Sequence, residues 1–327
     1  MASNMQMRQR MSRIFAGAFT ITIFIVLFKK VNLSQFEISA FYYLPAVIIF
    51  LSTLAAYILR AYTYRILLQQ KKVLPVGILF NITGVYNFVS SLFPFGIGHL
   101  TYPYYIQKYT YISLSHSLNS LFVYNSVRVL LLLILMAISV VEGIQVHQFY
   151  VEFGKNKGAI FIFLVLIFVS VLIGFILRVG GSGNGENRDN LFSRTIAGLR
   201  AFIQYDLKML PPVTILAIFV IFFNTVNIYF SYQTFGIKLS IFPVIFLLSL
   251  NNLSTLLPIH TLSSIGSFEL VNTLGMVLLG FDSNQAIQIS FAVHFLGLAS
   301  QSILAVACYY ALRKFYCPEI SFQENNR

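Results

Sequence analysis

Charged residues are scarce in this sequence, and acidic residues are the scarcest of them. Only 10% of its 327 residues are charged, with 10 Asp and Glu against 22 Lys and Arg, whereas soluble domains carry about 25% charged residues. Cysteine occurs only twice, which excludes a disulfide framework and a thiolate metal site. The composition is therefore not that of a soluble domain, and most of the chain must lie in lipid.

Signatures of common enzymes are also missing from the sequence. It has no Gly-x-Ser-x-Gly motif, no His-Glu-x-x-His motif, no phosphate-binding Gly-Lys-Ser/Thr loop and no Asp-rich metal motif. The net charge of +12 could suggest nucleic acid, but no basic stripe interleaved with aromatics stands on a soluble surface. We therefore expect no enzyme activity, no cofactor and no nucleic-acid partner.

What the sequence has instead is apolar runs along its whole length, with 57% hydrophobic residues and a mean hydropathy of +0.79. A helix needs about 20 residues to cross the hydrocarbon core of a membrane. The first run follows several arginines, as in a signal peptide, but no small-residue cleavage site comes after it. We predict an all-α polytopic protein in which residues 1–327 form a single membrane domain. The six expected spans are residues 14–28, 41–59, 118–141, 159–177, 213–232 and 286–312.

Two further stretches, residues 75–116 and 241–285, begin apolar and then become rich in Gly, Pro, Ser, Thr and Tyr. Lys and Arg concentrate in cytoplasmic loops, and the basic clusters, one of which begins at Arg60, fall on one side only if each stretch returns to the side it entered from. We therefore predict two re-entrant helical hairpins that line a functional cavity. Residues 179–210 would be a cytoplasmic linker. Both termini would be cytoplasmic, in a multi-pass protein of the cell membrane, the bacterial inner membrane.

The two predicted hairpins share a sequence pattern. Aligned on Pro94 and Pro258, both read Asn-x-apolar-Ser-(Ser/Thr)-Leu-apolar-Pro, and the pattern begins at Asn87 in one copy and at Asn251 in the other. Each copy lies between two long spans. This correspondence indicates an internal duplication.

The predicted topology makes this duplication an inverted repeat. The first hairpin would enter from the cytoplasm and the second from outside, so that the repeat units are residues 41–141 and 213–312. Inverted repeats with broken helices that meet near the membrane midplane are typical of alternating-access carriers.

Two ionisable residues follow the glycine turns of the hairpins. His99 comes directly after Gly98, and Glu269 comes three residues after Gly266. A charge at membrane depth is costly unless it is paired or hydrated, which makes both residues site candidates. The helix N-terminus after each turn offers free N–H groups for an anion such as phosphate. Alternatively, Glu269 only caps its own helix and His99 only bonds a neighbouring carbonyl.

Other polar residues lie within the apolar spans. Arg128 either pairs with Glu269 or holds an anionic head group, and His294 is interpreted as a core histidine. Tyr102 belongs to a group of tyrosines expected to form an interfacial belt, although it could also line the cavity. Three asparagines are expected to bond across helices, namely Asn224, Asn227 and Asn272.

At the hairpins the sequence resembles the transmembrane region of lysylphosphatidylglycerol synthases, the flippase-like domain family. Leu-Pro-Ile-His at residues 257–260 with Ile-Gly-Ser-Phe-Glu at residues 265–269 is similar to that family's Pro and Gly-x-x-Glu pattern. Asn87, Pro94 and Gly98 resemble its earlier Asn, Pro and Gly positions.

The sequence departs from this family where an acidic residue and then an arginine often follow the first glycine turn, because His99 and Tyr102 stand there. The resemblance implies about eight membrane helical segments, a central lipid cavity and lipid transfer between leaflets. No soluble aminoacyl-transferase domain follows Arg327, so the synthase activity of fused relatives is not expected.

The function expected from these observations is translocation or presentation of a phospholipid or a polyprenyl-linked lipid. Two alternatives remain open at this point. The first is a membrane-embedded enzyme acting on a lipid with His99 and Glu269 as acid and base, and the second is a scaffold for an envelope glycosyltransferase or synthase. The expected substrate-binding residues are Asn87, Pro94, Gly98, His99, Tyr102, Arg128, Asn251, Pro258, Gly266 and Glu269.

Overall fold

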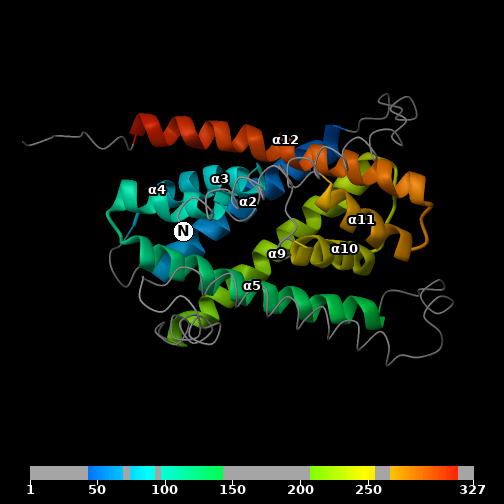
Figure 1. Cartoon of the computed structure of the whole chain (residues 1–327), viewed down its shortest axis with the longest axis horizontal. Coiled ribbons are helices and arrows are strands. Elements are labelled where there is room, and N and C mark those ends of the chain that lie inside the picture. Colours follow the sequence, from blue (N-terminus) through cyan, green and yellow to red (C-terminus); the bar gives the residue numbers. More distant parts are fainter. Residues whose placement is uncertain (1–42, 69–73, 93–96, 143–206, 255–265, 316–327) are drawn as a thin grey trace, which may run out of the picture.

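The computed structural model describes residues 43–68, 74–92, 97–142, 207–254 and 266–315 (Figure 1). Within these ranges the regular elements are helices and none is a strand, which confirms the predicted all-α class. The expected spans at residues 14–28 and 159–177 lie outside the described residues. So do Pro94, Pro258 and all but the last few residues of the predicted linker.

Within the described ranges, four helices are long and apolar enough to cross a membrane. They are α2 (Tyr43–Leu68), α5 (Leu114–Glu142), α9 (Leu210–Thr234) and α12 (Ser283–Phe315). Each exceeds the length of about 20 residues that the hydrocarbon core requires, and together they match four of the six predicted spans. The chain is therefore a multi-pass helical membrane protein.

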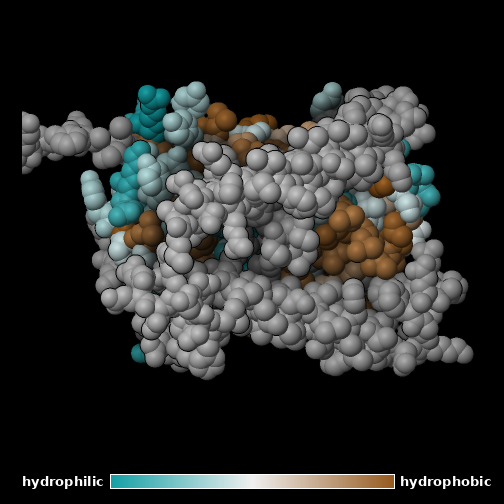
Figure 2. Space-filling view, viewed as in Figure 1, coloured by the Kyte–Doolittle hydropathy of each residue, from teal (hydrophilic) through white to brown (hydrophobic). Residues whose placement is uncertain are grey.

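The outward faces of these helices are apolar, as contact with lipid requires. Phe219 and Phe222 on α9 and Ile303 on α12 each expose half or more of their side chain. Figure 2 shows hydrophilic side chains mainly at the two ends of the long axis, with apolar side chains between them. This distribution fits a molecule whose long axis crosses the bilayer.

Each stretch predicted to turn back consists of helices too short to cross the membrane. The first contains α3 (Val76–Leu92), the 3-10 turn η3 (Ile97–Leu100) and α4 (Thr101–Thr110), and the second contains α10 (Ile241–Ser254) and α11 (Ser267–Leu278). In Figure 1, α3 and α4 lie toward one end of the long axis and α10 and α11 toward the other. Among the described residues, neither stretch contains a helix long enough to cross the membrane.

Helices from the two halves of the chain interleave. The most extensive packing is between α2 and α9, while α12 packs along α3 and α10 packs along α5. Asn227 on α9 donates to the Ile49 carbonyl (3.0 Å) and to the Thr53 hydroxyl (2.8 Å) of α2, which confirms that this asparagine bonds across helices. A Cβ at Gly84 of α3 would lie 2.5 Å from the sulfur of Cys308, so that glycine permits the close approach of α12.

The turn of the first hairpin also depends on a glycine. A Cβ at Gly98 would lie 2.4 Å from the Cα of Ser90 and 2.7 Å from the Val89 carbonyl oxygen. Backbone atoms cannot move aside as a flexible side chain can, so the turn can pack on α3 only if residue 98 lacks a side chain.

Gly98→Ala is therefore expected to destabilise the protein by about 1–3 kcal/mol, the usual cost of overpacking. Gly297→Ala is the matched control, because a Cβ there meets nothing within 4 Å and alanine favours a helix by up to about 1 kcal/mol. Thermal unfolding in detergent compares the two. Equal midpoints would show that the turn has room for a side chain.

Candidate functional site

A buried arginine lies where the sequence predicts the end of a span. The second span was expected to end at residue 59, but α2 continues to Leu68. That prediction is wrong because a basic residue does not itself end a helix, and arginine is a good helix former. Arg60 is consequently inside the helix, with only 9% of its surface exposed.

The Arg60 side chain is held between α2 and α3. Its Nη1 donates to Oδ1 of Asn87, and its guanidinium group lies 5.9 Å from the centre of the Tyr57 ring. Asn87 is itself fixed, because its Nδ2 donates to the Thr83 carbonyl at 2.8 Å. Asn87 therefore orients the guanidinium group of Arg60.

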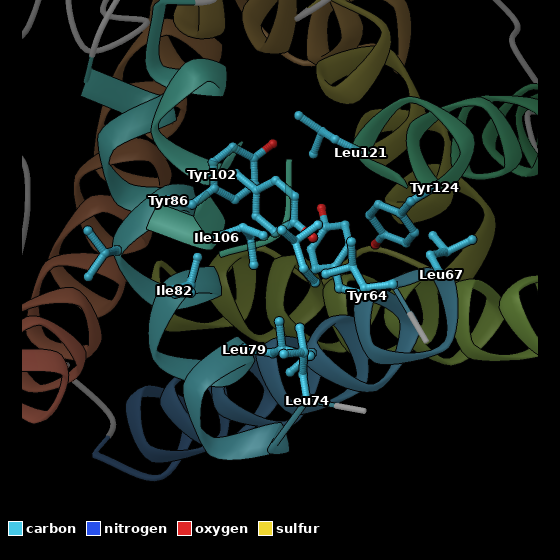
Figure 3. Packing of buried hydrophobic residues seen from close by; sticks show 14 of the residues in the cluster. Tyr64, Leu67, Leu74, Leu79, Ile82, Tyr86, Tyr102, Ile106, Leu121 and Tyr124 are labelled. Carbon is cyan, nitrogen blue, oxygen red and sulfur yellow. The ribbon is translucent and has the colours of Figure 1, made fainter. Parts of the chain in front are cut away.

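Arg128 on α5 joins the same region. The positive charges of Arg128 and Arg60 repel each other, and Tyr64, Tyr86 and Tyr124 lie within electrostatic range of both. Tyr64 packs edge-on against Tyr124, with ring centres 5.4 Å apart. Figure 3 shows tyrosines from α2, α3, α4 and α5 gathered here. We call this group the arginine–tyrosine cluster, and its members are Tyr57, Arg60, Tyr64, Tyr86, Tyr124 and Arg128.

His99 and Tyr102 border the arginine–tyrosine cluster. His99 Nδ1 shares a hydrogen bond of 2.8 Å with the Tyr86 hydroxyl. Tyr102 is fully buried, with its ring 4.5 Å from that of Tyr64 and its hydroxyl 3.4 Å from Ser120 Oγ. Its place is in the core and not in an interfacial belt.

Glu269 occupies a separate site in the second hairpin. It is 0% exposed, and its Oε1 lies 2.7 Å from Nδ1 of His294 on α12. Its Oε2 accepts a hydrogen bond of 2.5 Å from the N–H of Gly266, which has the positive φ of 91° that favours glycine. Glu269 thus caps α11 and binds His294, whose ring stacks on Phe268 at 4.5 Å.

The hypothesis that Glu269 pairs with Arg128 is therefore wrong. The packing of α11 on α12 brings His294 to the carboxylate, and both carboxylate oxygens are engaged. His294 is a buried histidine with a hydrogen-bond partner, which agrees with its interpretation as a satisfied core histidine. The two ionisable groups of the hairpins consequently have unlike surroundings: His99 lies beside the arginine–tyrosine cluster, and Glu269 has a histidine partner of its own.

Asn251 belongs to a hydrogen-bonded network of neutral side chains. Its Nδ2 donates to Oδ1 of Asn272 at 2.8 Å, and the same oxygen accepts from the Tyr232 hydroxyl at 2.8 Å. Nδ2 of Asn272 donates in turn to Ser290 Oγ at 2.9 Å. This network links α9, α10, α11 and α12 and confirms that Asn272 bonds across helices. These hydrogen bonds hold the four helices together.

The described residues favour anion binding over metal chemistry. No group of three or more His, Cys, Asp or Glu side chains comes together among them. The arginine–tyrosine cluster instead brings two guanidinium groups and several hydroxyls together, which are groups that bind phosphate and carboxylate.

Comparison with known proteins gives one match. The family described as "Lysylphosphatidylglycerol synthase TM region" matches residues 13–305. No curated protein matches the chain, and no solved structure matches it.

Proposed function

This chain belongs to the lysylphosphatidylglycerol synthase transmembrane-region family, and we propose that it is a flippase-like protein that moves a phospholipid or a polyprenyl-linked lipid between the leaflets of a cell membrane. The family links it to lipid-related processes in membranes. The observation that carries the more specific proposal is the placement of ionisable residues beside helices that cannot cross the bilayer. Arg60, Arg128 and Glu269 are such residues.

The arrangement of the short helices supports a carrier. α3 and α4 lie toward the opposite end of the molecule from α10 and α11 (Figure 1). The first short helix of each half packs on a long helix of the other half: α3 packs on α12, and α10 packs on α5. This reciprocal packing is expected of an inverted repeat with units 41–141 and 213–312. Inverted repeats are typical of carriers whose binding site opens alternately to the two sides of the membrane.

The enzyme alternative is less well supported. It requires His99 and Glu269 to act together on a lipid, but His99 bonds Tyr86 in the first hairpin and Glu269 bonds His294 in the second. The scaffold alternative, in which the chain holds an envelope glycosyltransferase or synthase, gives no reason for a buried Arg60 next to Arg128. We therefore favour a protein without enzyme activity.

Lipid analysis of a strain that lacks this protein, with leaflet-specific chemical labelling, tests the proposal. A carrier predicts that one lipid class shifts between leaflets while the chemical structures of the lipids stay the same. Loss of one lipid structure together with a rise in its precursor would point to an enzyme. An unchanged leaflet distribution would contradict the carrier.

The proposed topology makes a separate prediction. With the native cysteines replaced, Ser182→Cys is expected to react only with a reagent applied from the cytoplasmic side, and Lys155→Cys only with one applied from the other side. The reason is that the Lys and Arg distribution places residue 182 inside and residue 155 outside. Labelling of both positions from one side would contradict the inverted repeat.

A further inference from the structure

We propose that the arginine–tyrosine cluster is a binding site for the phosphate of an anionic lipid head group, and that it selects lipids of net negative charge over zwitterionic ones. The lipid nature of the ligand rests on the proposed function. The phosphate chemistry of the site rests on the charges, the hydrogen-bond donors and the geometry of the cluster itself.

The first argument is charge. Arg60 and Arg128 repel each other, and no carboxylate in the described part of the chain is placed to neutralise them. Glu269 is engaged with His294 and Gly266, and Asp282 caps the exposed start of α12. Glu142 follows Arg128 by fourteen residues on α5, which is about 21 Å along a helix. Two positive charges within apolar helices therefore call for an anion that the described residues do not supply.

The second argument is the kind of polar group left without a partner. Among the described residues, Nε of Arg60 and the hydroxyls of Tyr57 and Tyr124 are buried with no hydrogen-bond partner. An Nε–H group can only donate, and a tyrosine hydroxyl has a proton to donate. A buried donor without an acceptor costs about 1–3 kcal/mol. A ligand that satisfies all three must be rich in acceptors, as a phosphate is.

The third argument is preorganisation. One side of the Arg60 guanidinium group is fixed by Asn87, which leaves its Nε side for a ligand. The ring of Tyr64 packs against the rings of both Tyr102 and Tyr124, and these contacts restrict the motion of the three side chains. Fixed guanidinium and hydroxyl donors bind phosphate more tightly than mobile ones, because less entropy is lost on binding.

The second half of the molecule provides the internal contrast. Asn251 occupies the position that aligns with Asn87, but it donates to the neutral side chain of Asn272. The ionisable Glu269 there has a partner in His294. Among the described residues, buried positive charge and unused donors therefore occur together only in the first half, which favours a phosphate site between α2, α3 and α5.

Binding to the purified full-length protein in detergent tests the proposal. The probes are dihexanoyl phosphatidic acid, whose head group is a phosphate alone, dihexanoyl phosphatidylcholine, which adds a positive charge, and inorganic phosphate. Isothermal titration is expected to show saturable binding of phosphatidic acid, at least about tenfold tighter than that of phosphatidylcholine. Equal affinity for the two lipids would overturn the proposal. Inorganic phosphate binding as tightly as phosphatidic acid would show a site for the free ion and overturn its lipid character.

Asn87→Asp is the sharpest variant, because it places a carboxylate beside Arg60 with almost no change in shape. It is expected to keep the protein folded and to weaken phosphatidic acid binding by about tenfold or more, since the new carboxylate replaces the ligand's charge. Asn284→Asp adds the same charge at an exposed position of α12 and is the control. If Arg60 had only the structural role of bonding Asn87, Asn87→Asp would bind phosphatidic acid as the wild type does, and the proposal would fail.

These measurements separate the site from the function. Selective binding of phosphatidic acid by a protein that moves no lipid would keep the phosphate site and overturn the carrier. Translocation that is equal for anionic and zwitterionic lipids, without selective binding, would keep the carrier and overturn the phosphate site.

Discussion

Replacing Arg128 with Gln is expected to abolish translocation of an anionic lipid in reconstituted vesicles while the protein stays folded. An anionic head group that leaves water needs compensating charge, because an uncompensated charge in hydrocarbon is prohibitively costly. Arg60, which is buried, and Arg128, which is partly buried, are the two cations of the arginine–tyrosine cluster. Removal of Arg128 also relieves their mutual repulsion, so the free energy of unfolding should not fall.

The measurement is the rate at which a labelled phosphatidic acid crosses the membrane of vesicles that contain the protein. Arg313→Gln is the control, because it removes one positive charge from an exposed position at the end of α12. Arg128→Lys should recover part of the rate, since it restores the charge but not the planar donor geometry. Wild-type rates for both Arg128 variants would show that this residue is structural and would favour a scaffold.

Glu269→Ala is expected to cause a large loss of stability. The substitution leaves the N–H of Gly266 without its cap and His294 without its partner, in a position that is 0% exposed. Loss of a helix cap costs about 1 kcal/mol, and removal of one member of a buried pair costs about 3–5 kcal/mol. The expected result is a protein that unfolds far below the wild-type temperature in detergent.

Glu269→Gln should lose much less stability, because an amide can still accept from Gly266 and share a hydrogen bond with His294. Asp282→Ala is the matched control: Asp282 accepts from the N–H groups of Asn284 (2.9 Å) and Gln285 (3.2 Å) at an exposed helix start. It should cost about 1 kcal/mol. A Glu269→Ala variant no less stable than Asp282→Ala would contradict the role assigned to the buried pair.

The long helices could be predicted because hydropathy depends on composition over a whole window. The apolar runs gave α2, α5, α9 and α12, and the Gly and Pro content of the other two stretches predicted that they would not form full spans. The end of α2 could not be predicted in this way. Arg60 and Arg65 look like loop residues in a count of basic residues, but both lie within the helix.

The partners in the site could be predicted only in part. Arg128 and Glu269 stood out because ionisable residues are rare in apolar segments, but their partners depend on how the helices pack. His294 follows Glu269 by 25 residues and Asn87 follows Arg60 by 27, and neither spacing is a local motif. One signal was available for α2, since Tyr57, Arg60 and Tyr64 recur at the spacing of one helix face.

The two aligned asparagines of the repeat have different hydrogen-bond partners, which the sequence pattern alone does not predict. Asn87 and Asn251 align in sequence and both lie in the first helix of a hairpin, yet Asn87 accepts from Arg60 and Asn251 donates to Asn272. The residues that differ between the halves decide the charge at each site. In the proposed mechanism this asymmetry places the phosphate of the lipid on the side of α2, α3 and α5.

We propose that the protein moves anionic lipid across the bilayer by means of the arginine–tyrosine cluster. The most direct test of this proposal is a leaflet-accessibility assay on vesicles that contain the wild-type protein and a fluorescent phosphatidic acid, with an impermeant quencher added outside. Fluorescence from the inner leaflet is expected to be lost faster than in protein-free vesicles, and faster than for a fluorescent phosphatidylcholine. Loss at the protein-free rate for both lipids would contradict the proposal.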